Sequence, residues 1–534
     1  MKTFGVMLDV SRNGVMKPQE VKNFAKILSS FGYNMLQLYT EDTYKVDNEP
    51  YFGYMRGSYT KEELKDIVAY CASIGVEVVP CVQTLAHLNQ IFYWEPYKKI
   101  NDFGDILLAA EERTYALIEN MFKTLRECYT TKKIHLGMDE AHMLGLGKYL
   151  DKHGYCNRFD ILLEHLNKVL AIAKKYDFQP IMWSDMFFRL ANHGEYAPHN
   201  KNTAKEMKDK TPTEVGLVYW DYYRTNKTFY KEMLQIHKQF DNEIWFAGGA
   251  WSWMGFAPKN DLSLATMKPA MSVCRDMQIE NILITMWGDN GKECSFYGLL
   301  PALYAIRRFY DGVTDMRTIK SGFEVLTGEK FDVMKALDLP NKIAFNKKSM
   351  NGTLCKHALY GDPFLGFLDS TMNEEWAKTY KKYARRLSRY AKESKYEYIF
   401  ETLAQLCRTL SYKLGLGIRS RKVYQAKDME ALKLLIADYK RTEIELKRFI
   451  KLFRELWFRE NKPHGFEVQE QRLGGLLLRM ASCRIRLEDY LEGRIENIPE
   501  LEEKLLDFYG NEEDFLVKNL CYNKWGMTIS PNII

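Results

Sequence analysis

The sequence lacks the features that mark several common classes of protein. None of its apolar runs is long enough to cross a bilayer, and no basic, apolar leader precedes the first strand-like segment at residues 4–10. Its ten cysteines include no Cys-x-x-Cys pair, and its ten histidines show no His-Glu-x-x-His spacing. We therefore expect no membrane span, no disulfide framework, no metal and no other cofactor, and a reducing, cytoplasmic location. An exported form would need a signal that this sequence does not contain.

An excess of one charge is missing as well. The chain carries 76 Lys and Arg residues against 70 Asp and Glu residues, a net charge of +6, and the two signs are interspersed. Nucleic-acid-binding proteins concentrate positive charge on one face, so we expect no nucleic-acid partner. No Gly-rich phosphate loop follows the first strand-like run, which argues against a nucleotide-binding fold. The length of 534 residues indicates at least two domains.

The first 320 residues alternate between strand patterns and helix patterns. Helical segments such as 17–32, whose apolar residues share one face and which ends at Gly32, separate most of the short apolar runs. The eight runs are residues 4–11, 35–40, 76–82, 133–138, 179–185, 214–222, 243–251 and 281–289. Eight strand–helix units predict an α/β fold, a (β/α)8 TIM barrel over residues 1–325.

After about residue 325 the strand patterns stop. Long stretches rich in Lys, Arg, Glu, Leu and Tyr follow, and apolar residues from Leu432 to Trp457 recur at spacings of three, four or seven. Their many basic residues are interpreted as solvated helix faces. The sequence therefore predicts an α-helical C-terminal domain over residues 326–534 that packs on the barrel or on a partner subunit, and a homodimer is one expectation.

Chemistry-bearing side chains follow the predicted strand ends, where barrel enzymes hold their active sites. They comprise carboxylates, one arginine, one histidine and several aromatic residues. The candidates are Arg12, Asp42, His87, Asp139, Glu140, Trp183, Trp220, Tyr222, Trp251, Trp287, Asp289 and Glu293. Large flat tryptophan faces are suitable walls for a sugar ring or an acetamido methyl group.

Asp139 and Glu140 are adjacent at the end of the fourth predicted strand. Two like charges at a recessed position repel, so one carboxyl group is expected to have a raised pKa and to act as a general acid. Ordinary glycosidases place their two carboxylates about 5 to 10 Å apart, across the sugar. An adjacent pair suits a different mechanism, in which the 2-acetamido oxygen of the substrate attacks the anomeric carbon. One carboxylate then orients the acetamido group while its neighbour protonates the leaving oxygen.

The sequence resembles glycoside hydrolase family 20, the exo-β-N-acetylhexosaminidases. Residues 135–140, HLGMDE, are similar to that family's strand-four motif His-x-Gly-Gly-Asp-Glu, and residues 7–14, MLDVSRNG, look like its first-strand signature. Residues 37–44 and 84–87 match further segments less strictly. Met138 stands where the family has glycine, so the backbone near the acid is expected to differ. The resemblance covers about residues 4–310 and points to the branch that starts at the barrel and carries a helical C-terminal region.

The resemblance implies a role for each candidate residue. Asp139 would orient the acetamido group and Glu140 would be the acid and later the base, with His87 and Asp42 as a relay behind Glu140. The expected sugar contacts are Arg12 and Asp289 at outer hydroxyls, Trp183, Trp220 and Trp287 as walls, Tyr222 at the acetamido oxygen with Trp251 or Trp253 marking a rival position, and Glu293 as a further contact.

We therefore expect an exo-acting hydrolase that removes terminal, non-reducing β-linked GlcNAc or GalNAc from glycans or glycoconjugates with retention, through an oxazolinium intermediate. The expected partner is the terminal N-acetylhexosamine. Two alternatives stay open at the level of sequence. One is another substrate-assisted barrel family that removes GlcNAc from protein side chains, although such enzymes use an Asp-Asp pair. The other is a catalytically silent carbohydrate-binding protein.

Overall fold

The computed structural model describes residues 2–192, 194–197, 207–343, 352–508, 510 and 522–532. The chain forms two compact units that interleave along the sequence. The barrel unit contains residues 1–250, 263–287 and 302–322, and the helical unit contains residues 251–262, 288–301 and 323–534. The predicted boundary near residue 325 stays a prediction, because two earlier segments of the chain are grouped with the helical unit.

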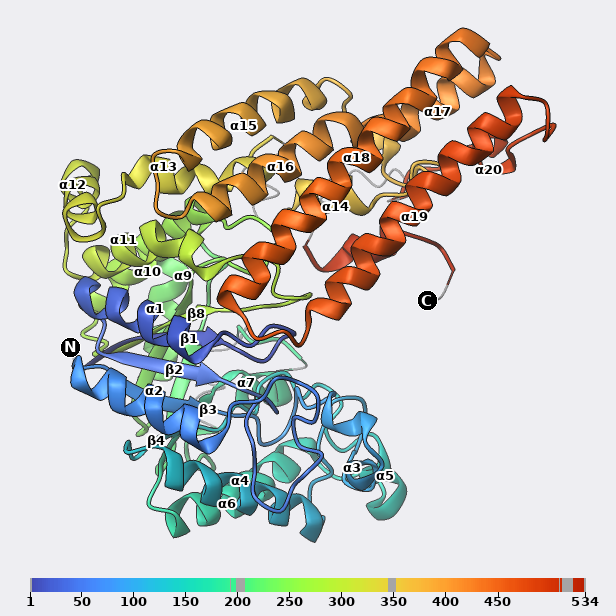
Figure 1. The fold of residues 1–534 in the computed structure, drawn as a ribbon. Helices are drawn as coiled ribbons and strands as arrows, with labels where there is room; N and C mark the ends of the chain where they lie inside the picture. Colours follow the sequence, from blue (N-terminus) through green and yellow to red (C-terminus); the bar gives the residue numbers. More distant parts are fainter. Residues whose placement is uncertain are drawn as a thin grey trace. The chain divides into compact units, whose positions relative to one another are not determined.

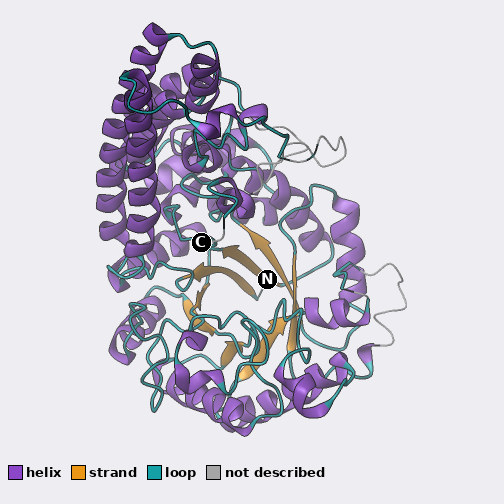
Figure 2. Cartoon of the chain, turned by 90° about the vertical axis from the view of Figure 1, so that its right-hand side faces the viewer, coloured by secondary structure: helices purple, strands orange, loops and turns teal. Residues whose placement is uncertain are grey.

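In the described part of the chain, eight parallel strands form one closed barrel in sequence order (Figure 2). The strands are β1 (Thr3–Asp9), β2 (Met35–Tyr39), β3 (Glu77–Cys81), β4 (Lys133–His135), β5 (Gln179–Trp183), β6 (Gly216–Trp220), β7 (Ile244–Gly249) and β8 (Asn281–Met286). Pairing of Thr3 with Asn281 closes the ring between β1 and β8. The sequence prediction of a TIM barrel is confirmed, because short apolar runs that are buried on both faces favour a fully covered parallel sheet.

Helices follow the strands and cover the barrel (Figure 1). They are α1 (Pro18–Phe31), α2 (Lys61–Ser73), α3 (Glu95–Lys98), α4 (Glu112–Cys128), α5 (Lys148–His153), α6 (Arg158–Lys175), α7 (Asp185–Ala191), α9 (Lys227–His237), α10 (Asn260–Asp276) and α11 (Leu300–Tyr310). Helix α1 buries Val21, Phe24 and Leu28 and ends at Gly32. The φ of Gly32 is 91°, a left-handed value that glycine adopts readily because it has no Cβ. Thr60 begins α2 with a reciprocal capping box to Glu63.

The helical unit contains long amphipathic helices. Its helices are α12 (Met316–Thr327, which starts in the barrel unit), α13 (Phe331–Lys335), α14 (Leu354–Tyr360), α15 (Trp376–Ala391), α16 (Glu397–Lys413), α17 (Leu416–Gln425), α18 (Met429–Glu460), α19 (Phe466–Leu491) and α20 (Pro499–Glu502). The predicted helix from Leu432 to Trp457 lies within α18, and its apolar stripe is buried. Gly465, with a φ of 93°, precedes the first residue of α19.

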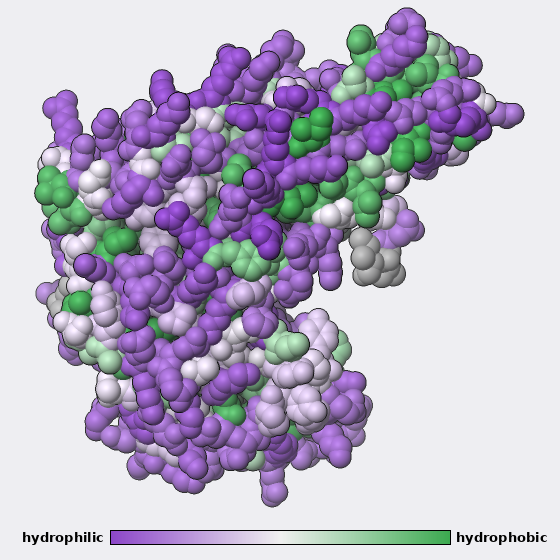
Figure 3. Space-filling view, viewed as in Figure 1, coloured by the Kyte–Doolittle hydropathy of each residue, from purple (hydrophilic) through white to green (hydrophobic). Residues whose placement is uncertain are grey.

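Hydrophilic side chains cover most of the face visible in Figure 3. None of the helices in the described residues combines the length and the apolar character that a membrane span requires.

The apolar stripe of α18 predicts where the helical unit is sensitive to mutation. Phe449 is fully buried and its ring packs on Phe256 and Phe453 at centroid distances of 5.2 and 5.8 Å. We expect Phe449→Ala to lower the free energy of unfolding by about 3 to 5 kcal/mol, because the truncation leaves a cavity. Leu434→Ala on the same helix is the control, since Leu434 is 73% exposed. Urea unfolding of the full chain, followed by circular dichroism, measures both, and equal losses would contradict the packing.

Candidate active site

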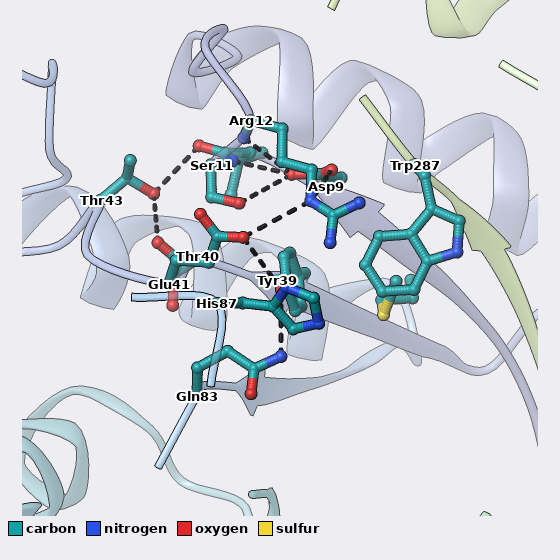
Figure 4. Close-up of polar contacts among 12 residues, drawn as sticks. Asp9, Ser11, Arg12, Tyr39, Thr40, Glu41, Thr43, Gln83, His87 and Trp287 are labelled. Atoms are coloured by element: carbon teal, nitrogen blue, oxygen red, sulfur yellow. Dashed lines mark hydrogen bonds and ion pairs between the residues drawn. The ribbon is translucent and has the colours of Figure 1, made fainter. Parts of the chain in front are cut away.

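The connection after β1 is folded back on itself by Asp9. Its Oδ1 atom accepts hydrogen bonds from the Ser11 backbone N–H and hydroxyl, both at 2.9 Å, and from the Arg12 backbone N–H at 3.1 Å. An aspartate that satisfies the backbone of the next residues is a usual device for a tight turn. Figure 4 shows that this turn brings the Arg12 side chain beside Glu41 and Trp287.

The Arg12 guanidinium lies between a carboxylate and an indole ring. Its Nε is 3.4 Å from Glu41 Oε1, and its central carbon is 4.7 Å from the Trp287 ring centroid. The Tyr39 hydroxyl also donates to Glu41 Oε1, at 3.0 Å. Burial raises the pKa of Glu41 to about 7, although Arg12 opposes the rise. The arginine is thus held by charge and by a cation–π contact, and it is 23% exposed at the strand ends.

The motif after β4 has a strained backbone. The strand ends at His135, and the non-glycine residues Met138 and Glu140 have φ values of 68° and 51°. Such values are uncommon for residues with a Cβ and cluster at functional sites. A larger residue would not fit at Gly137, whose φ is 74°, because a Cβ there would lie 2.1 Å from Gln83 Oε1. Bending of the backbone at these positions allows two adjacent carboxylates to serve one site.

The Gln83 side chain positions Asp139. The Gln83 amide donates to Asp139 Oδ1 at 2.8 Å and to the Tyr39 hydroxyl at 3.0 Å, and its carbonyl accepts from the Met138 backbone N–H at 3.2 Å. Sequence reasoning missed Gln83. The available signal was a polar residue directly after the apolar run 76–82.

His87 and Asp139 form an ion pair. The Nε2 atom of His87 lies 3.2 Å from Asp139 Oδ2 and 3.8 Å from Glu140 Oε2. Burial alone would lower the pKa of His87, but the Asp139 carboxylate outweighs it and raises the pKa to about 9. Burial likewise would raise the pKa of Asp139, but charge and hydrogen bonding from His87 and the Gln83 amide hold it below its ordinary value. Asp139 is therefore ionised at neutral pH.

The structure gives His87 a partner other than the expected Asp42. The Asp42 carboxylate pairs with Arg56 at 3.1 Å. Burial raises the pKa of Asp42 although Arg56 opposes this. Asp105 takes the expected place, since its Oδ2 is 3.6 Å from His87 Nδ1 and accepts from the His87 backbone N–H at 3.0 Å. Asp42 is thus occupied by Arg56, while its neighbour Glu41, with a φ of 40°, contacts Arg12.

The Asp185 side chain supports Glu140 by accepting a hydrogen bond from the Glu140 backbone. It is fully buried at the start of α7, where its Oδ2 accepts from the Glu140 backbone N–H at 3.2 Å and from Arg189 Nε at 3.1 Å. Burial and the nearby Asp139 carboxylate raise the pKa of Asp185, while Arg189 opposes the rise. Asp185 thus fixes the strained backbone of Glu140.

Four of the predicted aromatic residues form one continuous cluster. The Trp183 and Trp287 rings are 6.1 Å apart, and Trp287 Nε1 donates to the Tyr222 hydroxyl at 3.2 Å. Trp220 stacks on Tyr222 with centroids 5.5 Å apart. Trp183 Nε1 is buried and has no hydrogen-bond partner within the described residues. The structure therefore brings together aromatic residues that lie at the ends of three different strands, β5, β6 and β8.

The remaining predicted residues belong to the helical unit. Trp251 stacks on Trp253 at 4.2 Å, and Asp289 is partly exposed. Glu293 differs from expectation: it is buried, and its carboxylate lies 2.7 Å from Lys356 Nζ. Because a buried carboxylate needs a paired charge, Glu293 forms a structural ion pair instead of the expected sugar contact. Within the described residues no group of three or more His, Cys, Asp or Glu side chains is arranged to hold a metal ion.

The His87–Asp139 pair makes a measurable prediction. In Asp139→Asn the pKa of His87 should fall from about 9 to below its ordinary value, because burial then acts without the opposing charge. Asp105→Asn is the matched control and should change the pKa less, since Asp105 is farther from the ring. Imidazole NMR titration, with the His87 signal assigned by His87→Gln, measures the difference. A larger effect of Asp105→Asn would contradict the pairing.

Comparison with known proteins identifies the family. The model of the glycosyl hydrolase family 20 catalytic domain matches residues 4–235, and that of the Glycoside Hydrolase 20C C-terminal domain matches residues 329–520.

Human hexosaminidase D is 25% identical over 218 residues, 38% of this chain and 42% of that protein. An Akkermansia muciniphila β-hexosaminidase is 24% identical over 168 residues, 26% of this chain and 34% of that protein. The chain thus spans less than half the length of these curated relatives. A solved structure, the chitobiase of Flavobacterium johnsoniae, is 13% identical with a TM-score of 0.47, covering 81% of this chain and 74% of that one. The chain belongs to glycoside hydrolase family 20.

Proposed function

We propose that this protein is an exo-acting β-N-acetylhexosaminidase. It would remove terminal, non-reducing β-linked GlcNAc or GalNAc from glycans or glycoconjugates with retention, by a substrate-assisted mechanism. The observation that carries the proposal is the adjacent pair Asp139 and Glu140, in which Asp139 is kept ionised by His87 and Gln83. Family membership and the aromatic cluster at the strand ends support it.

Substrate binding would place the terminal sugar at the strand ends of the barrel. Arg12 offers donors to the outer hydroxyls, and Glu41 and Trp287 fix its orientation. The cluster of Trp183, Trp220, Tyr222 and Trp287 would enclose the acetamido group, since aromatic rings supply large apolar area with few polar edges.

The first chemical step would form the oxazolinium ion. The Asp139 carboxylate accepts the acetamido N–H and aligns the carbonyl oxygen with the anomeric carbon. A new bond forms between that oxygen and the anomeric carbon as the bond to the leaving oxygen breaks. The Glu140 carboxyl group, whose side chain is 42% exposed, donates its proton to the leaving oxygen. Intramolecular alignment of this kind contributes on the order of 7 to 11 kcal/mol in favourable systems.

The second step would reverse these roles. The Glu140 carboxylate accepts a proton from a water molecule, whose oxygen attacks the anomeric carbon while the bond to the acetamido oxygen breaks. The product is a free N-acetylhexosamine with its anomeric configuration retained and its acetamido group restored. His87 lies 3.8 Å from Glu140, and its positive charge would stabilise the carboxylate between the two steps.

The proposal extends to location and assembly. A reducing, cytoplasmic compartment is supported by the nine cysteines in the described residues, which are all free thiols. A homodimer stays a prediction, and the side chains that favour it are the exposed Ile444 on α18 and Leu478 and Ile485 on α19.

Turnover of aryl glycosides tests the proposal. The wild type should hydrolyse nitrophenyl N-acetyl-β-glucosaminide or N-acetyl-β-galactosaminide and leave the plain β-glucoside intact, because the glucoside lacks the attacking oxygen. Asp139→Asn and Glu140→Ala should each lower kcat by roughly 100-fold or more, while the exposed-site control Glu95→Ala should keep full activity. Equal turnover of the glucoside would indicate a carboxylate nucleophile, and no turnover of any substrate would favour the silent binding protein.

The pH profile tests the role of Gln83 as a positioning residue. Gln83→Leu removes a hydrogen bond that favours the ionised form of Asp139, so the pKa of Asp139 should rise and activity should be lost at a higher pH on the acid side. Gln83→Glu should shift this limb further, by about one pH unit or more, because it adds a like charge. Gln90→Glu is the control. A uniform loss of activity at every pH would mean that Gln83 only supports the fold.

A further inference from the structure

Exposed apolar side chains in the barrel unit are confined to one end of the barrel. Within the described residues of this unit, every strongly exposed large apolar side chain lies on a connection that follows a strand C-terminus. These residues are Tyr51, Tyr54 and Met55 after β2, Tyr93 and Phe103 after β3, Met143, Leu150 and Tyr155 after β4, and Tyr223 after β6. Figure 3 shows pale, weakly polar side chains gathered at the lower right, over the β2 and β3 connections that are blue in Figure 1. The same end of the barrel carries Asp139 and Glu140.

Two of these residues, Tyr51 and Tyr54, pack with the partly buried Trp94. The Tyr54 and Trp94 rings are 5.2 Å apart, the Tyr51 and Trp94 rings are 5.9 Å apart at 35°, and the two tyrosines are 6.0 Å apart. Tyr51 and Tyr54 are 42% and 43% exposed. We call Tyr51, Tyr54 and Trp94 the aromatic platform. Exposed aromatic surface is costly in water, so a contiguous group of this kind indicates a binding surface.

The platform is rigidly supported. The buried Glu49 carboxylate accepts from the Tyr97 hydroxyl at 2.9 Å and from Arg113 Nη1 and Nη2 at 2.8 and 2.6 Å. These bonds join the connection after β2 to the connection after β3 and to α4. Gly53 allows close approach, because a Cβ there would lie 2.0 Å from the Asp42 carbonyl oxygen. A surface held in this way binds a ligand with little loss of conformational entropy.

Arg56 connects the platform to the site of the proposed function. Its guanidinium donates to the Asp42 carboxylate and to the Ser11 carbonyl oxygen, next to Glu41 and Arg12. Trp94 follows His87 on the same connection. The platform therefore lies on the two connections, after β2 and after β3, that also carry Glu41 and His87.

The charges around the platform favour a neutral ligand. Asp47 pairs with Lys61, Glu49 with Arg113, and Arg56 with Asp42. The charged neighbours are thus balanced by partners within the protein, so the surface is not built to attract a highly charged peptide or nucleic acid. Its flat rings with polar edges suit sugar rings, which have apolar faces and polar rims.

We propose that the aromatic platform binds the sugars on the leaving-group side of the scissile bond. This inference rests on the proposed function, because an exo-acting enzyme encloses the terminal sugar and leaves the rest of the chain to cross the rim of the barrel. The natural substrate is then a neutral oligosaccharide chain, and a small alkyl or aryl glycoside uses only part of the site.

Comparison of short and long substrates tests the platform. The probes are nitrophenyl N-acetyl-β-glucosaminide and the neutral tetrasaccharide of β-linked GlcNAc, or the GalNAc counterparts where the wild type prefers them. Tyr54→Ala and Trp94→Ala should raise KM for the tetrasaccharide roughly 10-fold, the loss of one aromatic contact, and leave the nitrophenyl substrate within about twofold. Tyr54→Phe retains the ring and should resemble the wild type.

Tyr93→Ala is the matched control, because Tyr93 is 73% exposed on the same connection and outside the platform. An equal change for both substrates, or a change for neither, would overturn the platform. Self-association that Trp94→Ala abolishes, without a change in KM, would assign the surface to a second copy of the chain and likewise overturn it.

A second measurement separates failure of the platform from failure of the proposed function. Calorimetry of the tetrasaccharide with Glu140→Ala protein, with and without Tyr54→Ala, needs no turnover. If the wild type hydrolyses neither substrate, the proposed function fails, and a platform-dependent affinity still supports a glycan-binding surface. If hydrolysis proceeds and the affinity is independent of Tyr54, the platform alone is wrong.

Discussion

The ion pair between His87 and Asp139 is the interaction on which the candidate site depends. A buried carboxylate would ordinarily take up a proton, since burial disfavours charge. The imidazolium of His87 and the amide of Gln83 reverse this and keep Asp139 ionised. An ionised Asp139 can accept an N–H from a substrate, and the same positive charge lies 3.8 Å from Glu140. One histidine therefore lies within ion-pair distance of both carboxylates.

Backbone strain is concentrated around this pair. Glu41, His87, Met138 and Glu140 all have positive φ values, and each such residue costs of order 1 to 3 kcal/mol unless its surroundings hold it. Here three of these residues are held by hydrogen bonds from their backbone N–H groups to nearby side chains. Gln83 accepts the Met138 N–H, and the Glu140 N–H and the His87 N–H each donate to a carboxylate. The closed barrel supplies the rigid strand ends from which these supports project, so the geometry is fixed before a substrate arrives.

The two compact units divide the candidate residues between them. The carboxylates, Arg12 and the continuous aromatic cluster all lie in the barrel unit. The segments 251–262 and 288–301, which carry Trp251, Asp289 and Glu293, are grouped with the helical unit. There Glu293 pairs with the buried Lys356, so that neither charge is buried without a partner. The helical unit is thus more than a terminal addition, because it includes segments that follow two barrel strands.

The sequence alone determined the barrel and the long helices, and it named side chains that the structure places together after the strand ends. Apolar runs alternating with amphipathic helices leave few other folds, and the residues after strand ends converge whatever their distance along the chain. The local sequence pattern could not show which of these side chains form hydrogen bonds and ion pairs with one another. That His87 meets Asp105 instead of Asp42, that Gln83 holds Asp139, and that Asp185 supports Glu140 are contacts set by the bend of each connection, which depends on single φ values and long-range packing. Sequence specifies which side chains reach the barrel mouth, and only the tertiary structure decides which atoms touch, because hydrogen bonds are sensitive to tenths of an ångström while the hydrophobic pattern is not.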